Sequence, residues 1–175
     1  MKKSTYKITL FAILSAVALT LSFLESLIPV TAFMPVGAKA GFSNIATMFA
    51  ASSMGFVPAS AITLIKALFA GVTRGPTAFL MSLAGGMLST AAMYFMFRFS
   101  KNSGYMLIGV VSALMHNLGQ LAVACALVGS SAAIGYAPVV ILAGIVTGAV
   151  TGSVLKAVLP ALLKFEKTLI RKGEK

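Results

Sequence analysis

Six long apolar runs constrain this chain more than any other feature, because they leave room for little except membrane-spanning helices. Prolines, glycines and charged residues separate the runs, which cover about residues 7–28, 39–54, 57–71, 76–97, 104–128 and 138–159. A lipid bilayer offers the backbone no hydrogen-bond partner, so each run is predicted to be an α-helix. A full crossing takes about 20 residues, so the second and third runs are short for a span.

The composition supports six transmembrane helices in one membrane domain over residues 1–175. Hydrophobic residues make up 59% of the chain and charged residues 10%, too few to coat a water-facing surface. The mean hydropathy is +1.00, whereas a soluble domain averages about 45–50% apolar residues. The first apolar run exceeds the roughly 7–15 residues of a signal-peptide core, which favours a retained helix. We therefore predict an all-α integral membrane protein.

The charged residues are biased toward lysine and arginine, with 14 basic against 3 acidic side chains and a net charge of +11. In a soluble protein this excess would point to nucleic acid. Here the basic residues gather at the chain ends and in one central turn, which would leave only Lys39 and Arg74 on the opposite side of the membrane. The positive-inside rule then predicts a plasma-membrane protein with both termini in the cytoplasm and a basic tail over 160–175. We expect contact with the lipid bilayer and none with nucleic acid.

Seven polar or charged side chains interrupt the apolar runs. They are Glu25, Lys39, Asn44, Lys66, His116, Asn117 and Gln120. Because successive helices alternate in direction, these residues are expected at or beyond the midplane, toward the outer side of the membrane. His116 and Gln120 are four residues apart and share one helical face, with Asn117 one step round it.

Such residues are costly inside a membrane, where they usually face a cavity or each other and mark a functional site. We predict that all seven line an outward-opening, net positive cavity for a small anionic or polar substrate. A structural alternative stays open for single members. One histidine can pack without a ligand, and one asparagine can bond to a neighbouring helix.

Two series of small residues predict close contacts between helices. Ala12 and Ala16 lie one turn apart on the first run, and Gly144, Gly148 and Gly152 form a stripe on the sixth. We expect the glycines to pack inside the protein. For the two alanines, internal packing and docking on another protein are both open.

Several chemistries lack the residues that they need. The chain has no P-loop motif for ATP and no aspartate, and its acids are Glu25, Glu166 and Glu174. One histidine and one cysteine, His116 and Cys125, do not make a zinc site. We therefore predict no metal, no cofactor and no catalytic activity.

Four stretches resemble a known family: LESLIPV, GAKAGFSNI, GPTAFLMSLAGGMLS and HNLGQLAVA. They are similar to the Gx transporter family, also called heptaprenyl diphosphate synthase component I, over roughly residues 20–125. That family looks like the substrate-binding S components of energy-coupling factor (ECF) transporters. The resemblance implies a six-helix bundle, an outward pocket, and three partners, which are one membrane coupling subunit and two ATPase subunits. It also implies that Ala12 and Ala16 dock on the coupling subunit.

Two functions follow from these observations. The leading hypothesis is an S component that binds a vitamin or cofactor precursor for transport. The alternative is a non-catalytic accessory membrane protein of isoprenoid or quinone biosynthesis. Prenyl diphosphate synthases work through aspartate-rich magnesium motifs, and a chain without aspartate cannot itself be such a synthase. An autonomous carrier is disfavoured because no inverted repeat is visible.

Overall fold

The computed structural model describes residues 3–27, 41–100, 103–128, 134–135 and 137–173, and its described elements are all α-helices. They are α1 (Lys3–Leu27), α2 (Asn44–Ser53), α3 (Phe56–Arg74), α4 (Pro76–Phe99), α5 (Tyr105–Val128) and α7 (Ala137–Gly173). The predicted all-α class is confirmed. Each apolar run of the sequence has its helix, with the main differences at the second, third and sixth runs.

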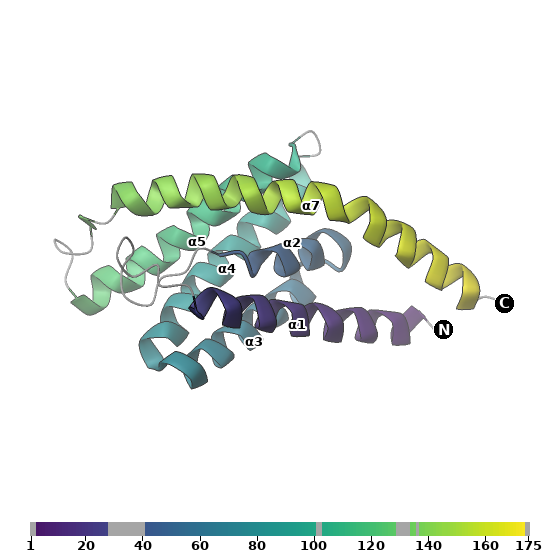
Figure 1. The fold of residues 1–175 in the computed structure, drawn as a ribbon, viewed down its shortest axis with the longest axis horizontal. Coiled ribbons are helices and arrows are strands. Elements are labelled where there is room, and N and C mark those ends of the chain that lie inside the picture. Colours follow the sequence, from purple (N-terminus) through teal and green to yellow (C-terminus); the bar gives the residue numbers. More distant parts are fainter. Residues whose placement is uncertain (1–2, 28–40, 101–102, 129–133, 136, 174–175) are drawn as a thin grey trace.

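Glycines with positive φ set the boundaries of α3. Gly55, with φ of 95°, precedes the helix, and Gly75, with φ of 92°, separates it from α4. The Gly75 N–H closes the last turn of α3 on the Gly71 carbonyl at 2.9 Å. Pro76 then starts α4 at a position where a helix needs no N–H. A side chain at either capping glycine would strain the backbone, so this short turn makes α3 and α4 antiparallel neighbours (Figure 1).

The second helix is shorter than the predicted range 39–54. α2 begins at Asn44 and has 10 residues, and residues 39 and 40 lie outside the described part of the chain. Before it, Gly41 has φ of 89°, and the Asn44 N–H donates to the Gly41 carbonyl at 2.9 Å. Residues 41–43 therefore form a turn rather than the first turn of a longer helix.

Five of the described helices are long and apolar enough to cross a membrane, as expected of a multi-pass membrane protein. The qualifying segments are Thr5–Leu27, Phe56–Arg74, Pro76–Phe99, Tyr105–Leu127 and Ala137–Pro160. The third run, predicted as 57–71, is the longer helix Phe56–Arg74 in the structure and therefore qualifies. At about 1.5 Å per residue, α2 reaches only about half of a hydrocarbon core that is about 30 Å thick. The six predicted crossings are thus matched by five full-length helices and one of half length.

The last helix is longer than the predicted range 138–159. α7 has 37 residues and passes through Pro160 without ending, so the predicted tail over 160–175 continues the helix as far as Gly173. Proline removes one backbone hydrogen bond, to the carbonyl of Lys156, but the turns on either side keep theirs. Figure 1 shows α7 bending in its C-terminal part.

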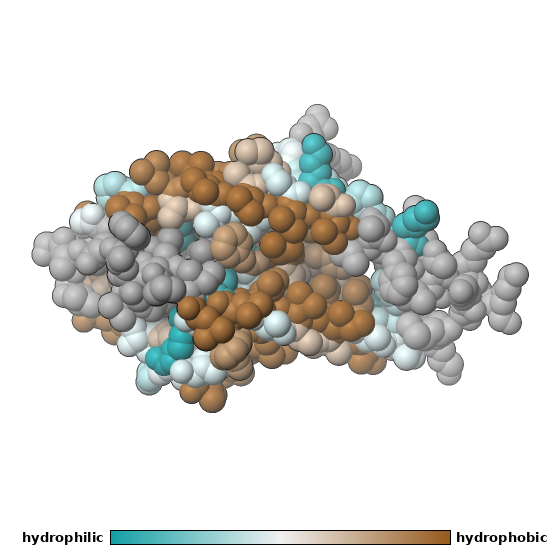
Figure 2. Space-filling model, viewed as in Figure 1, coloured by the Kyte–Doolittle hydropathy of each residue, from teal (hydrophilic) through white to brown (hydrophobic). Residues whose placement is uncertain are grey.

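The helices form one bundle in which both chain ends lie at the same end (Figure 1). α3, α4, α5 and α7 pack in chain order, while α2 contacts α1, α3, α4 and α7. Figure 2 shows apolar side chains over the middle of the visible face, along α1 and α7. Large apolar side chains such as Ile13, Val72 and Leu142 are exposed. A surface of this kind matches a lipid environment rather than water.

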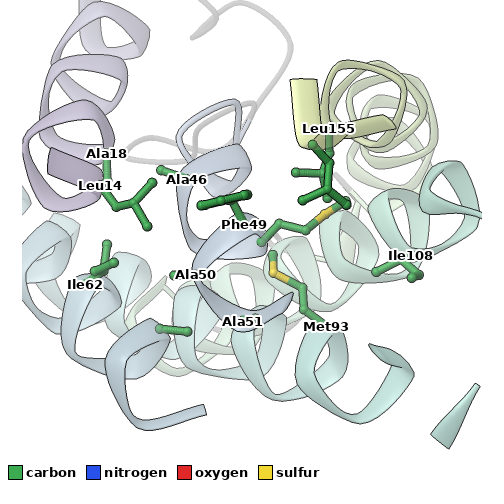
Figure 3. Packing of buried hydrophobic residues seen from close by; sticks show 13 residues of the cluster. Leu14, Ala18, Ala46, Phe49, Ala50, Ala51, Ile62, Met93, Ile108 and Leu155 are labelled. Atoms are coloured by element: carbon green, nitrogen blue, oxygen red, sulfur yellow. The ribbon is translucent and has the colours of Figure 1, made fainter. Parts of the chain in front are cut away.

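The main apolar core surrounds α2 in the half of the bundle nearer the termini. Figure 3 shows Phe49 and Ala50 of α2 among Leu14, Ile62 and Leu155, which come from α1, α3 and α7. The half-length α2 therefore occupies the middle of the bundle. Its amino end is left facing the other half of the bundle.

Glycines let α5 and α7 pack with their backbones in contact. A Cβ on Gly148 would lie 2.5 Å from the Cα of Val110, and one on Gly152 would lie 2.6 Å from the Cα of Met106. Real Cβ atoms do not approach so closely, so α5 occupies the space in which side chains would stand. Gly144 also faces α5. The prediction that this stripe packs internally is confirmed.

Candidate functional site

The polar candidate residues in the described part of the chain are all buried. Each of them is only 4–6% exposed. They are Glu25, Asn44, Lys66, His116, Asn117 and Gln120. They come from α1, α2, α3 and α5, on the side of the apolar core away from the termini. Lys39, the seventh predicted residue, lies outside the described residues.

Glu25 is a buried acid near the end of α1. Its Oε1 accepts a hydrogen bond from the Phe42 N–H, in the turn before α2. Its charge acts on two cations of α3, the buried Lys66 and the half-buried Arg74. An isolated charge costs several kcal/mol to bury, so these opposite charges compensate one another.

Lys66 connects α3 to α2. Its Nζ donates a hydrogen bond to Oδ1 of Asn44 at 2.9 Å. Asn44 is the first residue of α2, so the amide stands at the amino end of that helix. The ammonium and the carboxylate of Glu25 therefore both reach the same short stretch of chain, residues 42–44.

His116 and Gln120 form a pair on one face of α5, as their spacing predicts. Nε2 of Gln120 lies 3.0 Å from Nε2 of His116. An amide nitrogen can only donate, so this bond has the histidine nitrogen as its acceptor. The turn before α2 also reaches this pair. A Cβ on Gly41 would lie 3.1 Å from Nδ2 of Asn44 and 3.9 Å from Cδ2 of His116. The five side chains of Glu25, Asn44, Lys66, His116 and Gln120 thus gather around the turn at residues 41–44, and we call them the polar cluster.

Gly85 of α4 is a contributor that the sequence argument missed. A Cβ there would lie 2.5 Å from the carbonyl oxygen of His116 and 3.0 Å from Cγ of Gln120. Across the same contact, a Cβ on Gly119 would lie 2.6 Å from the Cα of Gly85. The two glycines bring α4 against α5 and hold the His116–Gln120 face close to the neighbouring helix. The signal was the glycine pair in the stretch LAGGM.

Asn117 faces away from the polar cluster. Its Nδ2 donates to the carbonyl of Val140 in α7 at 2.8 Å, and a Cβ on Gly144 would lie 2.8 Å from the same nitrogen. The structure therefore places Asn117 in the contact between α5 and α7, and does not bring it together with the other five.

A pair of hydroxyl groups lies one turn from Lys66, and the sequence argument missed it as well. Oγ1 of Thr63 and Oγ1 of Thr90 are 2.7 Å apart, between α3 and α4, and both side chains are buried. Thr63 also donates to the carbonyl of Ala59. This pair extends the hydrophilic interior from the polar cluster toward the apolar core. Its signal was the i, i+3 spacing of Thr63 and Lys66 on one helical face.

Ala12 and Ala16 lie on the outer face of α1. Both are exposed, together with Ile13 and Val17, while Leu14 of the same helix is buried in the core. The glycine stripe of α7 packs on α5, whereas none of the described helices covers the small-residue stripe of α1.

The polar cluster combines charged groups with hydrogen-bonding groups. It offers one ammonium, one carboxylate, two amides and one imidazole, all from buried side chains. Among the described residues, no group of three or more histidine, cysteine, aspartate or glutamate side chains is arranged to hold a metal ion. Such a set suits a ligand with several hydrogen-bonding groups and a charge.

A family model describes most of this chain. The model for heptaprenyl diphosphate synthase component I matches residues 14–158. The chain belongs to this family. The family match extends from α1 to the part of α7 that precedes Pro160, and so includes the whole polar cluster. No curated protein and no solved structure matches the chain significantly.

Proposed function

We propose that this protein is the substrate-binding membrane subunit, or S component, of an ECF-type transporter. Its substrate is a vitamin or cofactor precursor with anionic or polar groups. The observation that carries the proposal is the polar cluster itself. Four helices deliver five hydrophilic side chains to one buried place in a protein whose other interior residues are largely apolar.

The cost of the polar cluster argues for a ligand. Charged and amide side chains within a membrane lose several kcal/mol of hydration unless they are paired. Elsewhere in the bundle the contacts are largely apolar, since α5 and α7 pack through glycines and α2 packs through apolar residues. A binding role supplies the reason for keeping them.

The exposed alanines support a docking role for α1. In this proposal, Ala12 and Ala16 face the membrane coupling subunit, which joins the protein to two ATPase subunits. Their exposure leaves room for a helix of another protein to approach closely.

The distribution of charge supports an orientation in the plasma membrane. Exposed basic residues include Lys7 in the first turns of α1 and Arg98 in the last turn of α4. These two helix ends lie toward the end of the bundle that carries the termini (Figure 1). The positive-inside rule makes that end cytoplasmic. The polar cluster then belongs to the outer half, where a substrate enters from outside the cell.

The direct test is to purify the protein from its native membrane and identify a co-purified small molecule by mass spectrometry. His116→Ala is expected to lose this molecule at unchanged protein yield. Met115→Ala changes the neighbouring residue of α5, which is 36% exposed, and is the matched control that should retain it. Equal retention by both variants would remove His116 from the site, and absence of any ligand from the parent protein would count against the transport proposal.

A second function is favoured by the description of the family. As a non-catalytic accessory subunit of heptaprenyl diphosphate synthesis, the protein would bind a soluble prenyl diphosphate synthase at the membrane. Without aspartate it has no residues for the magnesium chemistry of that reaction. Gentle solubilisation and affinity capture separate the two proposals. Recovery of ATPases with a membrane coupling protein supports the first, and recovery of a prenyl synthase supports the second.

A further inference from the structure

The amino end of α2 holds an acid that comes from another helix. The first turn of α2 has no acidic residue of its own, and Ser43 makes no side-chain capping bond there. The positive end of a helix dipole attracts an anion. Here that anion is Glu25 of α1, which accepts the Phe42 N–H. Because Glu25 is 6% exposed, the carboxylate reaches this position inside the protein rather than at its surface.

The charges at this position are neighbours without being directly bonded. Among the described residues, Oε2 of Glu25 has no hydrogen-bond partner although it is buried. The Lys66 ammonium has three N–H donors, and its hydrogen-bond acceptor among the described residues is Asn44 rather than Glu25. A close-packed ion pair would join the two charges directly. Here Glu25 instead accepts from the turn before α2, while Lys66 bonds to the amide of the first residue of the same helix.

We propose that Glu25 is an internal stand-in for the carboxylate of the substrate. It occupies an anion position formed by the amino end of α2 and Lys66. The inference rests on the proposed binding function and specifies the substrate class, a small molecule that carries a carboxylate. When the substrate binds, its carboxylate takes this position and Glu25 moves aside.

This arrangement makes Glu25 a specificity-determining residue that competes with the ligand. The apparent affinity of a ligand falls by the fraction of time for which its position is already occupied. Removing the charge of Glu25 is therefore expected to raise the affinity for a carboxylate probe by about tenfold or more. Removing the charge of Lys66 is expected to abolish the gain.

The experiment compares acetate with acetamide, a neutral molecule of the same shape, as stabilisers of the full-length protein in detergent. Acetate is expected to raise the Tm of Glu25→Gln by about 2–4 °C, and acetamide is not. The parent and Glu25→Gln/Lys66→Gln should respond to neither. Glu166→Gln, which removes an acid from the C-terminal part of α7, is the matched control and should behave like the parent. If Glu25→Gln does not fold, Glu25→Asp retracts the carboxylate by one methylene and should show a smaller response to acetate.

Two results would overturn the proposal. One is an equal effect of acetate on the parent and on the Glu25 variants, which is a general salt effect. The other is no effect on either Glu25 variant. The outcome is separable from that of the proposed function. An acetate response without any co-purified ligand keeps the anion position and removes the transport role, whereas a retained ligand without an acetate response removes only the stand-in role of Glu25.

Discussion

On α1, α2, α3 and α5, the residues that build the apolar core lie nearer the end with the termini than the residues of the polar cluster do. Leu14 precedes Glu25 on α1, and Ile62 precedes Lys66 on α3. On α2, which runs the other way along this axis, Asn44 precedes Phe49. We call the two regions the apolar half and the polar half. The same helices cross both, in the same lipid surroundings.

The difference between the halves shows which residues the fold requires. The apolar half closes around α2 by shape and volume alone, with Phe49 and Met93 almost completely buried. In the polar half, two opposite charges and amide side chains occupy the interior. Replacing buried ion pairs by apolar residues of similar volume is often neutral or stabilising in proteins. This comparison supports the binding role that we propose for the polar half.

The largest effect is expected from unbalancing the charges of the polar half. Lys66→Met leaves Glu25 buried without one of the two cations that compensate it, which should lower the free energy of unfolding by about 3–5 kcal/mol. The double variant Glu25→Gln/Lys66→Met removes both charges and should recover most of that loss. Thermal unfolding of the purified proteins in one detergent makes the comparison. Equal stability of the single and double variants would show that the two charges are not coupled.

A cavity in the apolar half should cost nearly as much without touching the binding of a ligand. Met93 is 0% exposed, and Met93→Ala is expected to destabilise the protein by about 2–5 kcal/mol. The remaining folded protein should hold the co-purified molecule as well as the parent does. Mass spectrometry, normalised to the folded fraction, measures this. Loss of the ligand at full folding would break the separation of the two halves.

A smaller effect is expected at Asn117, which lies beside the polar half but faces α7. Its bond to the Val140 carbonyl resembles other hydrogen bonds between membrane helices, which contribute about 0.6 kcal/mol on average and up to about 1.7. Asn117→Ala should therefore lower stability by about 1 kcal/mol and leave ligand retention unchanged, in contrast to His116→Ala. Ligand loss in Asn117→Ala would return this residue to the binding site as the sequence predicts.

The helices show where local sequence was enough and where it was not. Gly75 and Pro76 predict the boundary between α3 and α4 from the sequence alone, and the structure has the boundary at these residues. The start of α2 is different, because the turn at Gly41 is completed by the bond from Phe42 to Glu25, 17 residues earlier in the chain. That bond exists only after α1 has packed beside α2. At Pro160 the sequence predicted the end of the last helix, but α7 continues through this residue. A long helix tolerates one missing hydrogen bond.

The candidate site shows the same division. The rarity of charged and amide groups in apolar runs was sufficient to find the residues of the polar cluster. The direction in which each side chain points depends on how the helices pack, and the sequence alone did not predict it. Asn117 is one residue from His116, but a step of about 100° on the helix turns it to a different neighbour. Gly85 was missed because the sequence does not show which helix a glycine packs against. The next residue, Gly86, packs against Thr63 of α3 instead of against α5.

The smallest effect on stability is expected where neither half is involved. Ala12 is exposed on the outer face of α1, so Ala12→Leu adds apolar surface toward lipid and should change the free energy of unfolding by less than about 0.5 kcal/mol. The same change fills the shallow stripe that Ala12 forms with Ala16, and should block close approach of a partner helix. If the proposed transporter role holds, ligand retention is expected to stay at the parent level, while capture of a coupling protein and ATPases is lost. Ile13→Leu, which changes shape but not size at an exposed neighbour, should leave that capture intact. Unchanged capture by Ala12→Leu would move docking to another face of the bundle, whereas loss of the ligand would show that the outer face of α1 and the polar half are not independent.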